Sequence, residues 1–188
     1  MQEVSWYQQS PKTSLELITK VAPNRKASII DVGGGDGFLV DELLKLGYTN
    51  ITVLDISENA INKAKKRLGK IAEQIRWVIS DITEFSPNQQ YDVWHDRAVF
   101  HFLTNKKDVE KYKDLVAENI SKKEHFILAT FSDSGPNKCS GLDICKYSEK
   151  QLKDTFAEKF KVLDSFTKNH NTPFGTKQNF TFMLFSKI

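Results

Sequence analysis

The sequence predicts an α/β fold, with a doubly wound, mostly parallel sheet, helices on both faces and an antiparallel strand pair at the C-terminal end. Three observations predict it. Short apolar runs rich in β-branched and aromatic residues alternate with helical patterns, which is typical of βαβ units. Four glycines between positions 33 and 37 stand where the first apolar run meets the first helical pattern. The last two apolar runs are separated only by a segment containing Pro and Gly, as in a hairpin.

The expected elements follow in order along the chain. Five apolar runs are predicted to form the parallel strands: 27–33, 50–56, 74–81, 91–97 and 125–131. The segments 38–47 and 57–69 have apolar residues at helical spacing and end in Gly, and the second begins at a Ser, so both are expected to be crossover helices. Two further helices and the two closing strands are expected at 108–120, 148–160, 161–170 and 178–188.

Length and charge are those of one ordinary domain. The chain has 188 residues, of which 39% are hydrophobic, and this is enough for one substantial core but short for two domains. We therefore expect a single domain over 1–188. The net charge of +3 comes from lysines interspersed with acidic residues at helical spacing, which favours solvated helix faces over a surface that binds nucleic acid.

The cysteines and the apolar runs exclude further classes of protein. Cys139 and Cys145 are the only cysteines, too few for a disulfide framework and without partner pairs for a zinc site, so no metal is expected. The N-terminal segment has no basic stretch followed by an apolar core, and no apolar run is long enough to cross a bilayer. These features predict a cytoplasmic enzyme or binding domain without a membrane partner.

The glycine cluster is the main functional signal. It is predicted to lie at the carboxyl end of the first strand, where ligands bind in open α/β sheets and where a helix start offers unpaired N–H groups. A flexible turn is the alternative, but the entropic cost of so many glycines favours a ligand site. The pattern G-x-G-x-x-G of nicotinamide enzymes would need Gly at position 38, where Phe38 stands.

The pattern Asp31-x-Gly33-x-Gly35-x-Gly37 resembles the first motif of class I S-adenosylmethionine-dependent methyltransferases. The resemblance implies a Rossmann-like sheet of seven strands. It also implies that Asp31 and the loop, with Gly34 included, admit the methionine part of S-adenosyl-L-methionine close to the backbone. S-adenosyl-L-homocysteine would then be the product.

Two further acidic residues are expected at strand ends. Asp55 ends the second strand, where a carboxylate can accept hydrogen bonds from both hydroxyls of a ribose; a helix-capping Asp is the alternative. Asp81 ends the third strand, and the resemblance implies that it lies against the adenine amino group; a simple turn Asp is the alternative. Ile56 and Ile82, which follow these acids, are assigned to the same cofactor site, with Ile82 along the adenine ring.

The segment YDVWHDRAVFHFLT, which ends the fourth strand, resembles small bacterial-type methyltransferases that include tellurite-resistance-like and thiol-methylating relatives. The resemblance implies that His95 meets the methionine amino group of the cofactor. Asp96 can orient that ammonium, pair with Arg97 or act as a base. His101 can exchange a proton or a hydrogen bond with the substrate, or is a packed or capping histidine. Arg97 can bind a substrate carboxylate, or only lock the loop through Asp96.

The pocket walls are expected outside the cofactor motifs. Residues 1–22 are predicted to form a helical lid segment within the domain, with Trp6 and Tyr7 folded over the cleft; packing onto the core is the alternative. The long loop after the fifth strand carries Cys139, which can contact a thiol, selenol or metalloid substrate or be simply buried. The aromatic residues assigned to a closed pocket are Trp6, Tyr7, Phe100 and Phe131.

These features together predict a methyltransferase that moves a methyl group to a small-molecule nucleophile by in-line displacement. A thiol-type acceptor is favoured, because the sequence offers one candidate base and neither paired bases nor a metal cluster for activating a hydroxyl. A protein-lysine methyltransferase is the first alternative, so a protein substrate stays possible. A catalytically silent cofactor-binding protein is the second.

Overall fold

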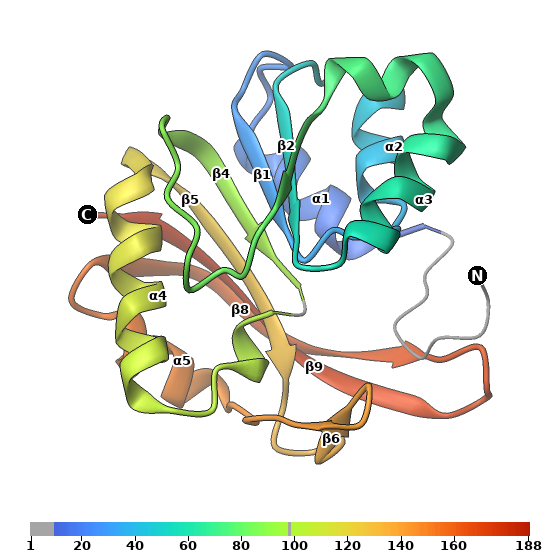
Figure 1. Cartoon of the computed structure of the whole chain (residues 1–188). Helices are drawn as coiled ribbons and strands as arrows, with labels where there is room; N and C mark the ends of the chain where they lie inside the picture. The colour runs from blue at the N-terminus through green and yellow to red at the C-terminus, as the bar shows by residue number, and fades with distance from the viewer. Residues whose placement is uncertain (1–9, 98) are drawn as a thin grey trace.

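The computed structural model describes residues 10–97 and 99–188 and folds them around one central sheet (Figure 1). In this part of the chain the sheet has seven strands in the order β3-β2-β1-β4-β5-β9-β8. The first five run parallel, and β9 lies antiparallel between β5 and β8. The predicted doubly wound α/β fold with its antiparallel pair is confirmed. The strands are β1 (Ile29–Val32), β2 (Ile51–Asp55), β3 (Arg76–Ile79), β4 (Tyr91–Asp96), β5 (Ile120–Phe131), β8 (Phe160–Asn171) and β9 (Lys177–Lys187).

Helices cover both faces of the sheet, with α1, α2 and α3 on one side and α4 and α5 on the other (Figure 1). Each face has its own hydrophobic core, to which α1 and α2 contribute on the first side and α4 and α5 on the second. The bounds are α1 (Lys12–Val21), α2 (Leu39–Lys45), α3 (Glu58–Leu68), α4 (Lys106–Asn119) and α5 (Glu149–Phe156), with 3₁₀ turns η1 (Gly69–Gln74) and η2 (Phe100–Phe102).

Side-chain caps fix where three of these helices begin. The hydroxyl of Ser57 accepts the Ala60 N–H at the start of α3, and Asn105 caps α4 in the same way. Ser148 and Gln151 form a complete capping box at α5, the arrangement that satisfies two otherwise unpaired backbone donors. Gly69 ends α3, so the helix that the Ser and Gly signals predicted is confirmed.

Two features of the chain between α4 and α5 differ from the expectation. The strand β5 begins at Ile120, five residues before its apolar run. The polar residues 121–124 belong to the strand but have no alternating buried face, so the sequence pattern does not mark them. The loop after β5 contains a small hairpin, β6 (Lys138–Cys139) and β7 (Leu142–Asp143), which is too short to give a periodic pattern.

The helical part of the predicted N-terminal lid belongs to the core. Ile18 of α1 is fully buried and Leu17 nearly so, both in the core cluster on the α2 side. We therefore restrict the lid hypothesis to the residues before Lys12. Of these, residues 1–9 lie outside the described part of the chain. Over 10–97 and 99–188, no helix combines the length and the apolar character needed to cross a membrane.

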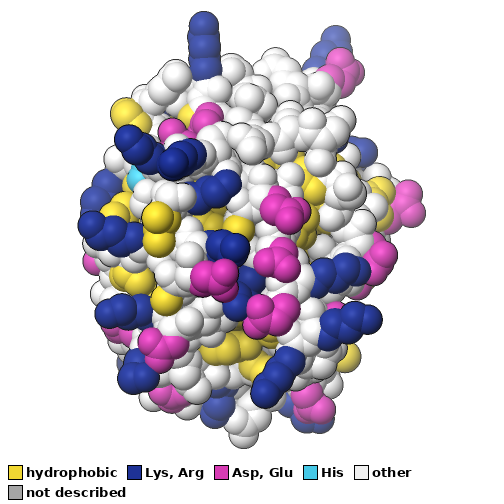
Figure 2. Space-filling view, turned by 90° about the vertical axis from the view of Figure 1, so that its left-hand side faces the viewer, with side chains coloured by type: hydrophobic (Ala, Val, Ile, Leu, Met, Phe, Trp, Pro, Cys, Tyr) yellow, Lys and Arg dark blue, Asp and Glu magenta, His cyan; other side chains and the backbone are white. Residues whose placement is uncertain are grey.

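Figure 2 shows the face that carries α4 and α5, where basic and acidic side chains are interspersed. Several of them pair along one helix, as Lys113 does with Glu110 and Lys150 with Asp154. The expected solvated helix faces are thus seen on this side of the molecule.

Candidate active site

The glycine loop leaves β1 in a conformation that only glycine adopts easily. Gly33 and Gly35 have φ values of 72° and 45°, in the left-handed region that side chains disfavour. A Cβ at Gly34 would lie 2.6 Å from an Asp31 oxygen and 2.8 Å from Val53, and a Cβ at Gly35 would lie 2.9 Å from an Asp55 oxygen. The loop between the ends of β1 and β2 therefore needs glycine at these positions.

Arg67 of α3 holds this loop in place. Its Nη1 donates to the Asp36 carbonyl and its Nη2 to the Gly37 carbonyl, both at 2.8 Å. Its Nε and Nη2 also bind both oxygens of Asp41 in α2, at 3.0 and 2.7 Å, and the guanidinium lies 4.4 Å from the centre of the Phe38 ring. Sequence reasoning missed this clamp, because Arg67 stands in a run of basic residues whose directions only the packed helix reveals.

Asp55 stands at the end of β2, facing the glycine loop. One of its oxygens accepts the Ser57 N–H at 2.7 Å, which is the contact expected of the capping alternative, while the other lies toward Gly35. Burial raises the pKa of Asp55, and the Ser57 N–H opposes that shift. The charges of Asp31 and Asp36 raise this pKa further, so three carboxyl groups gather around the loop. A pair of donor hydroxyls would suit this acceptor-rich place.

The other residues assigned to the cofactor site, Ile56, Asp81 and Ile82, lie in different environments. Ile56, the residue after β2, is 69% exposed, so its side chain is free to contact a ligand. Ile82 is buried in the core on the α4 side. Asp81 is exposed, and its Oδ1 accepts the N–H and the hydroxyl of Thr83, both at 2.8 Å, as a turn Asp does. The adenine roles of Asp81 and Ile82 stay predictions.

His95 and Asp31 form a buried chain with Ser14. The His95 Nδ1 lies 2.7 Å from an Asp31 oxygen and its Nε2 lies 2.9 Å from the Ser14 hydroxyl. The imidazole therefore ties α1 to β1 and β4 at the edge where the glycine loop starts. The predicted contact of His95 with the cofactor stays a prediction. It concerns the His95 backbone, because both ring nitrogens are already hydrogen-bonded to Asp31 and Ser14.

Asp96 is fully buried and organises the turn after β4. It accepts the N–H groups of Val99 at 2.8 Å and Phe100 at 3.2 Å, and the Tyr112 hydroxyl at 2.6 Å. Burial and the Asp96 charge both raise the pKa of Tyr112. A carboxylate with these three donors is better suited to holding the loop than to removing a proton from a substrate.

Arg97 and His101 lie together beyond β4 with polar atoms that lack partners. The Arg97 Nε and Nη2 and both His101 ring nitrogens are buried, and none has a hydrogen-bond partner among the described residues. The Arg97 guanidinium lies 5.1 Å from the centre of the Phe180 ring. The His101 ring lies 4.7 Å from that of Phe131, which lies 4.5 Å from Phe180. Of these residues Phe180, on β9, was not predicted.

Burial decides the charge states of this pair. It lowers the pKa of His101 to about 3, and the nearby Arg97 charge adds to this shift. It also lowers the pKa of Arg97 to about 10, against the attraction of Asp31. At neutral pH the site therefore holds one cation and one neutral imidazole.

The remaining predicted pocket residues are distributed differently. Phe100 packs in the core on the α4 side, with ring centres 5.1 Å from Tyr112 and from Tyr147, so we no longer include it in the pocket. Cys139 is buried in the core cluster that contains Phe131 and Phe180, and burial raises its pKa. Trp6 and Tyr7 lie outside the described residues.

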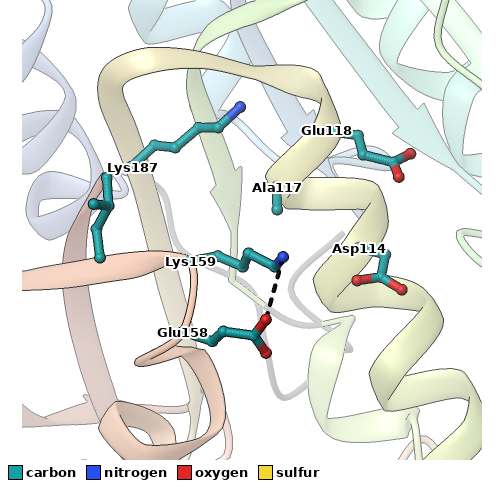
Figure 3. A pocket seen from close by; sticks show the side chains of 7 residues that line it. Asp114, Ala117, Glu118, Glu158, Lys159 and Lys187 are labelled. Atoms are coloured by element: carbon teal, nitrogen blue, oxygen red, sulfur yellow. Dashed lines mark ion pairs between the residues drawn. The ribbon is translucent and has the colours of Figure 1, made fainter.

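A hollow of about 410 Å³ lies at the opposite edge of the sheet, where α4 and β9 end (Figure 3). Asp114, Glu118, Glu158, Lys159 and Lys187 line it. Its ion pair, Lys159 with Glu158 at 3.3 Å, is between largely exposed side chains, and such pairs are typical of solvated surface. We place the candidate active site at the glycine loop instead.

Solved structures share this fold closely. The N-methyltransferase NodS from Bradyrhizobium japonicum superposes with a TM-score of 0.75 at 16% identity, covering 96% of this chain and 89% of that one. TehB from Haemophilus influenzae gives 0.72 at 20% identity, covering 92% and 62%. The fold is that of the class I S-adenosylmethionine-dependent methyltransferases. Residues 29–119, which include the glycine loop, Asp55 and Arg97, match the family described as "Methyltransferase domain", and the predicted family resemblance is confirmed.

Curated relatives differ in the substrates that their names give. The chain is 31% identical over 88 residues to malonyl-[acyl-carrier protein] O-methyltransferase 2 of Ilyobacter polytropus, covering 46% of this chain and 34% of that protein. It is 26% identical over 144 residues to human EEF1A lysine methyltransferase 2, covering 73% and 56%. The chain thus spans between a third and just over half of the length of these two relatives.

Proposed function

We propose that the protein binds S-adenosyl-L-methionine at the glycine loop and transfers its methyl group to a small-molecule nucleophile, leaving S-adenosyl-L-homocysteine. The observation that carries this proposal is the bare backbone of Gly33–Gly37, facing Asp55 and with the exposed Ile56 close by. The structure of the fold relative NodS in complex with S-adenosyl-L-homocysteine supports the choice of cofactor.

Each part of the cofactor has a matching group in this arrangement. The loop backbone suits the methionine part, because no Cβ stands in its way, and the Asp55 carboxylate suits the ribose hydroxyls. Ile56 offers an apolar surface to the adenine, and Asp81 stays assigned to its amino group. The backbone at His95 stays assigned to the methionine ammonium.

The acceptor in this proposal arrives deprotonated or with a free electron pair. Methyl transfer from a sulfonium is an in-line displacement, so holding the nucleophile and the methyl carbon in line supplies much of the catalysis. A histidine whose pKa is about 3 is a weak base, so His101 positions the acceptor by hydrogen bonding rather than removing a difficult proton. This favours a thiol-type acceptor, present in part as thiolate, or a free amine over a hydroxyl.

A protein-lysine acceptor is the second candidate. The similarity to human EEF1A lysine methyltransferase 2, which extends over 73% of this chain, is the observation that favours it. The buried position of His101 and Phe131 favours a small acceptor, because a protein side chain needs an open approach. A cofactor-binding protein without turnover is the remaining alternative.

The test is methyl transfer from labelled S-adenosyl-L-methionine to separate panels of thiols, amines, carboxylates and lysate proteins. We expect label in a small thiol or amine, at least tenfold reduced at subsaturating cofactor in Asp55→Ala. Label confined to protein bands would support the lysine alternative, and cofactor binding without transfer to any panel would support the silent one. Absence of cofactor binding would contradict all three.

A further inference from the structure

One edge of the Arg97 guanidinium has no hydrogen-bond partner among residues 10–97 and 99–188. Its Nε and Nη2, the two atoms without partners, are the pair whose N–H bonds point in parallel along one edge of the planar guanidinium. This edge has the spacing of the two oxygens of a carboxylate, which it can bind with two parallel hydrogen bonds. Buried polar groups in folded proteins nearly always have partners, so a vacant charged edge indicates a ligand.

The neighbouring His101 extends the same site. Both of its nitrogens are buried without partners in the described part of the chain. Its ring contacts Phe131, which contacts the Phe180 ring that lies against the Arg97 guanidinium. Because the imidazole is neutral, one nitrogen donates and the other accepts. A ligand anion could therefore receive a third hydrogen bond here, after the two from Arg97.

Aromatic rings form the apolar part of the site. Phe180 stacks under the Arg97 guanidinium, and Phe131 bridges Phe180 and His101. Gln178 lies two residues before Phe180 on β9, hence on the same face of that strand, and its buried Oε1 also lacks a partner among the described residues. A ligand with a carboxylate and a flat or apolar body would match this combination.

The site lies beside the glycine loop, on the side away from β2. Asp96, which precedes Arg97, pairs in register with Val32 at the end of β1. Val99, two residues past Arg97, has the side chain that a Cβ at Gly33 would meet. A ligand held by Arg97 would thus lie next to the methionine end of the cofactor, where the acceptor must be.

We propose that Arg97 and His101 bind the carboxylate of the methyl acceptor, which makes the substrate a small carboxylate-bearing thiol or amine. This inference rests on the proposed function. Arg97 supplies the charge and two parallel N–H groups, His101 supplies a third donor, and Phe131 and Phe180 pack against the body of the acceptor. The reacting sulfur or nitrogen then faces the methyl group, with the carboxylate as its anchor.

The test is an NMR titration of the full chain saturated with S-adenosyl-L-homocysteine, using benzoate and its neutral analogue benzamide as probes. We expect benzoate, and not benzamide, to shift the Arg97 Nε–H resonance. Arg97→Gln should weaken benzoate binding at least tenfold, since it removes a charge-assisted bidentate contact, and Arg97→Lys should weaken it less. Arg25→Gln is the matched control, because Arg25 also stacks over a ring, that of Tyr48, but is exposed.

The outcomes separate this inference from the proposed function. Equal response to benzoate and benzamide, or no shift at Arg97, would overturn the inference, and this comparison needs no variant to fold. A second result would also overturn the inference. If Arg97→Gln bound S-adenosyl-L-homocysteine more weakly than the wild type, while both bound decarboxylated S-adenosylmethionine equally, Arg97 would bind the carboxylate of the cofactor and not that of the acceptor. Failure of the wild-type protein to bind S-adenosyl-L-homocysteine, with benzoate still shifting Arg97, would contradict the proposed function alone.

Discussion

The two halves of the carboxyl edge of the sheet differ in how well their polar groups are hydrogen-bonded. In the half formed by β1, β2 and α3, the Gly33 N–H donates to the Leu54 carbonyl at 2.7 Å, and Arg67 has partners at every nitrogen. In the half formed by β4, β5 and β9, Arg97 and His101 keep buried polar atoms without partners in the described residues. The first half holds its shape without a ligand, and we propose that a ligand completes the second.

This difference has an energetic meaning. We call the half formed by β1, β2 and α3 the cofactor half, and the half formed by β4, β5 and β9 the acceptor half. A buried polar group without a partner costs about 1–3 kcal/mol, so the unpaired atoms of the acceptor half lower the stability of the ligand-free protein. The hydrogen bonds of Arg67 in the cofactor half add to it. Substitutions in the cofactor half should therefore act on shape and affinity. Substitutions in the acceptor half should be tolerated or even stabilising while they abolish recognition.

The largest expected effect is that of a side chain in the glycine loop. Gly35→Val should lower the affinity for S-adenosyl-L-methionine by more than about a hundredfold, because the added atoms meet Asp55 and fill the bare backbone, at a φ of 45°. Calorimetry measures this. Gly47→Val is the matched control, with a φ of 86° and open space around its Cβ. An unchanged affinity of folded Gly35→Val would show that the cofactor does not approach this loop.

Removing the proposed ribose acceptor should have the next largest effect. Asp55→Ala takes away the carboxylate that would accept the ribose hydroxyls, and losing a hydrogen bond to a charged group costs about 1.5–3 kcal/mol. We therefore expect about a tenfold to hundredfold loss of affinity for the cofactor by calorimetry. Asp164→Ala, at an exposed ion pair with Lys20, should bind as the wild type does, and equal affinities in both variants would reject the role of Asp55.

In the acceptor half, His101→Phe should change how stability depends on pH. The folded-state pKa of His101 is about 3 and its ordinary value is 6.5, so between these pH values the unfolded chain binds a proton that the folded one does not. The stability that depends on His101 is thus present above pH 6.5 and is lost as the pH falls toward 3.

Lowering the pH from 7 to 5 should cost the wild type, through this residue, about 2 kcal/mol of unfolding free energy. Urea unfolding of His101→Phe should show a pH dependence weaker by that amount. An identical pH dependence of His101→Phe and wild type would mean that the pKa of His101 is not lowered, which would contradict the buried environment described for it.

The same comparison shows what the sequence can reveal. The cofactor half was predictable because its residues come from one continuous stretch: Asp31, Gly33 and Gly35 lie at the end of one strand and Asp55 ends the next. The acceptor half is assembled from β4, β5 and β9. Arg97 and His101 were found through their place after β4, but Phe180 is one of several aromatic residues in β9 that alternation alone cannot distinguish.

The fold shows the same division between local and distant causes. Strands with apolar runs were placed within a few residues, because alternation and β-branched residues mark them. The start of β5 at Ile120 was not, since a polar stretch is carried along by its neighbours rather than by burial. The role of Arg67 also depends on tertiary contact, because only the packing of α3 beside the loop aims its side chain at Asp36 and Gly37.

The smallest expected effect, that of Arg67→Lys, tests whether the cofactor half is shaped before binding. Lysine keeps the charge but has no planar fork, so it cannot hold the carbonyls of Asp36 and Gly37 and both oxygens of Asp41 at once. Loss of these bonds should lower the unfolding free energy by about 1–2 kcal/mol. Cofactor affinity should fall by only about threefold to fivefold, because the loop glycines and Asp55 remain and binding must merely order a looser loop. Lys66→Met, at the exposed neighbouring position, should change neither quantity. If Arg67→Lys lost stability but bound the cofactor with wild-type affinity, the Arg67 hydrogen bonds would stabilise the fold without preparing the loop for the cofactor. The preformed shape of the cofactor half would then depend on the loop glycines alone.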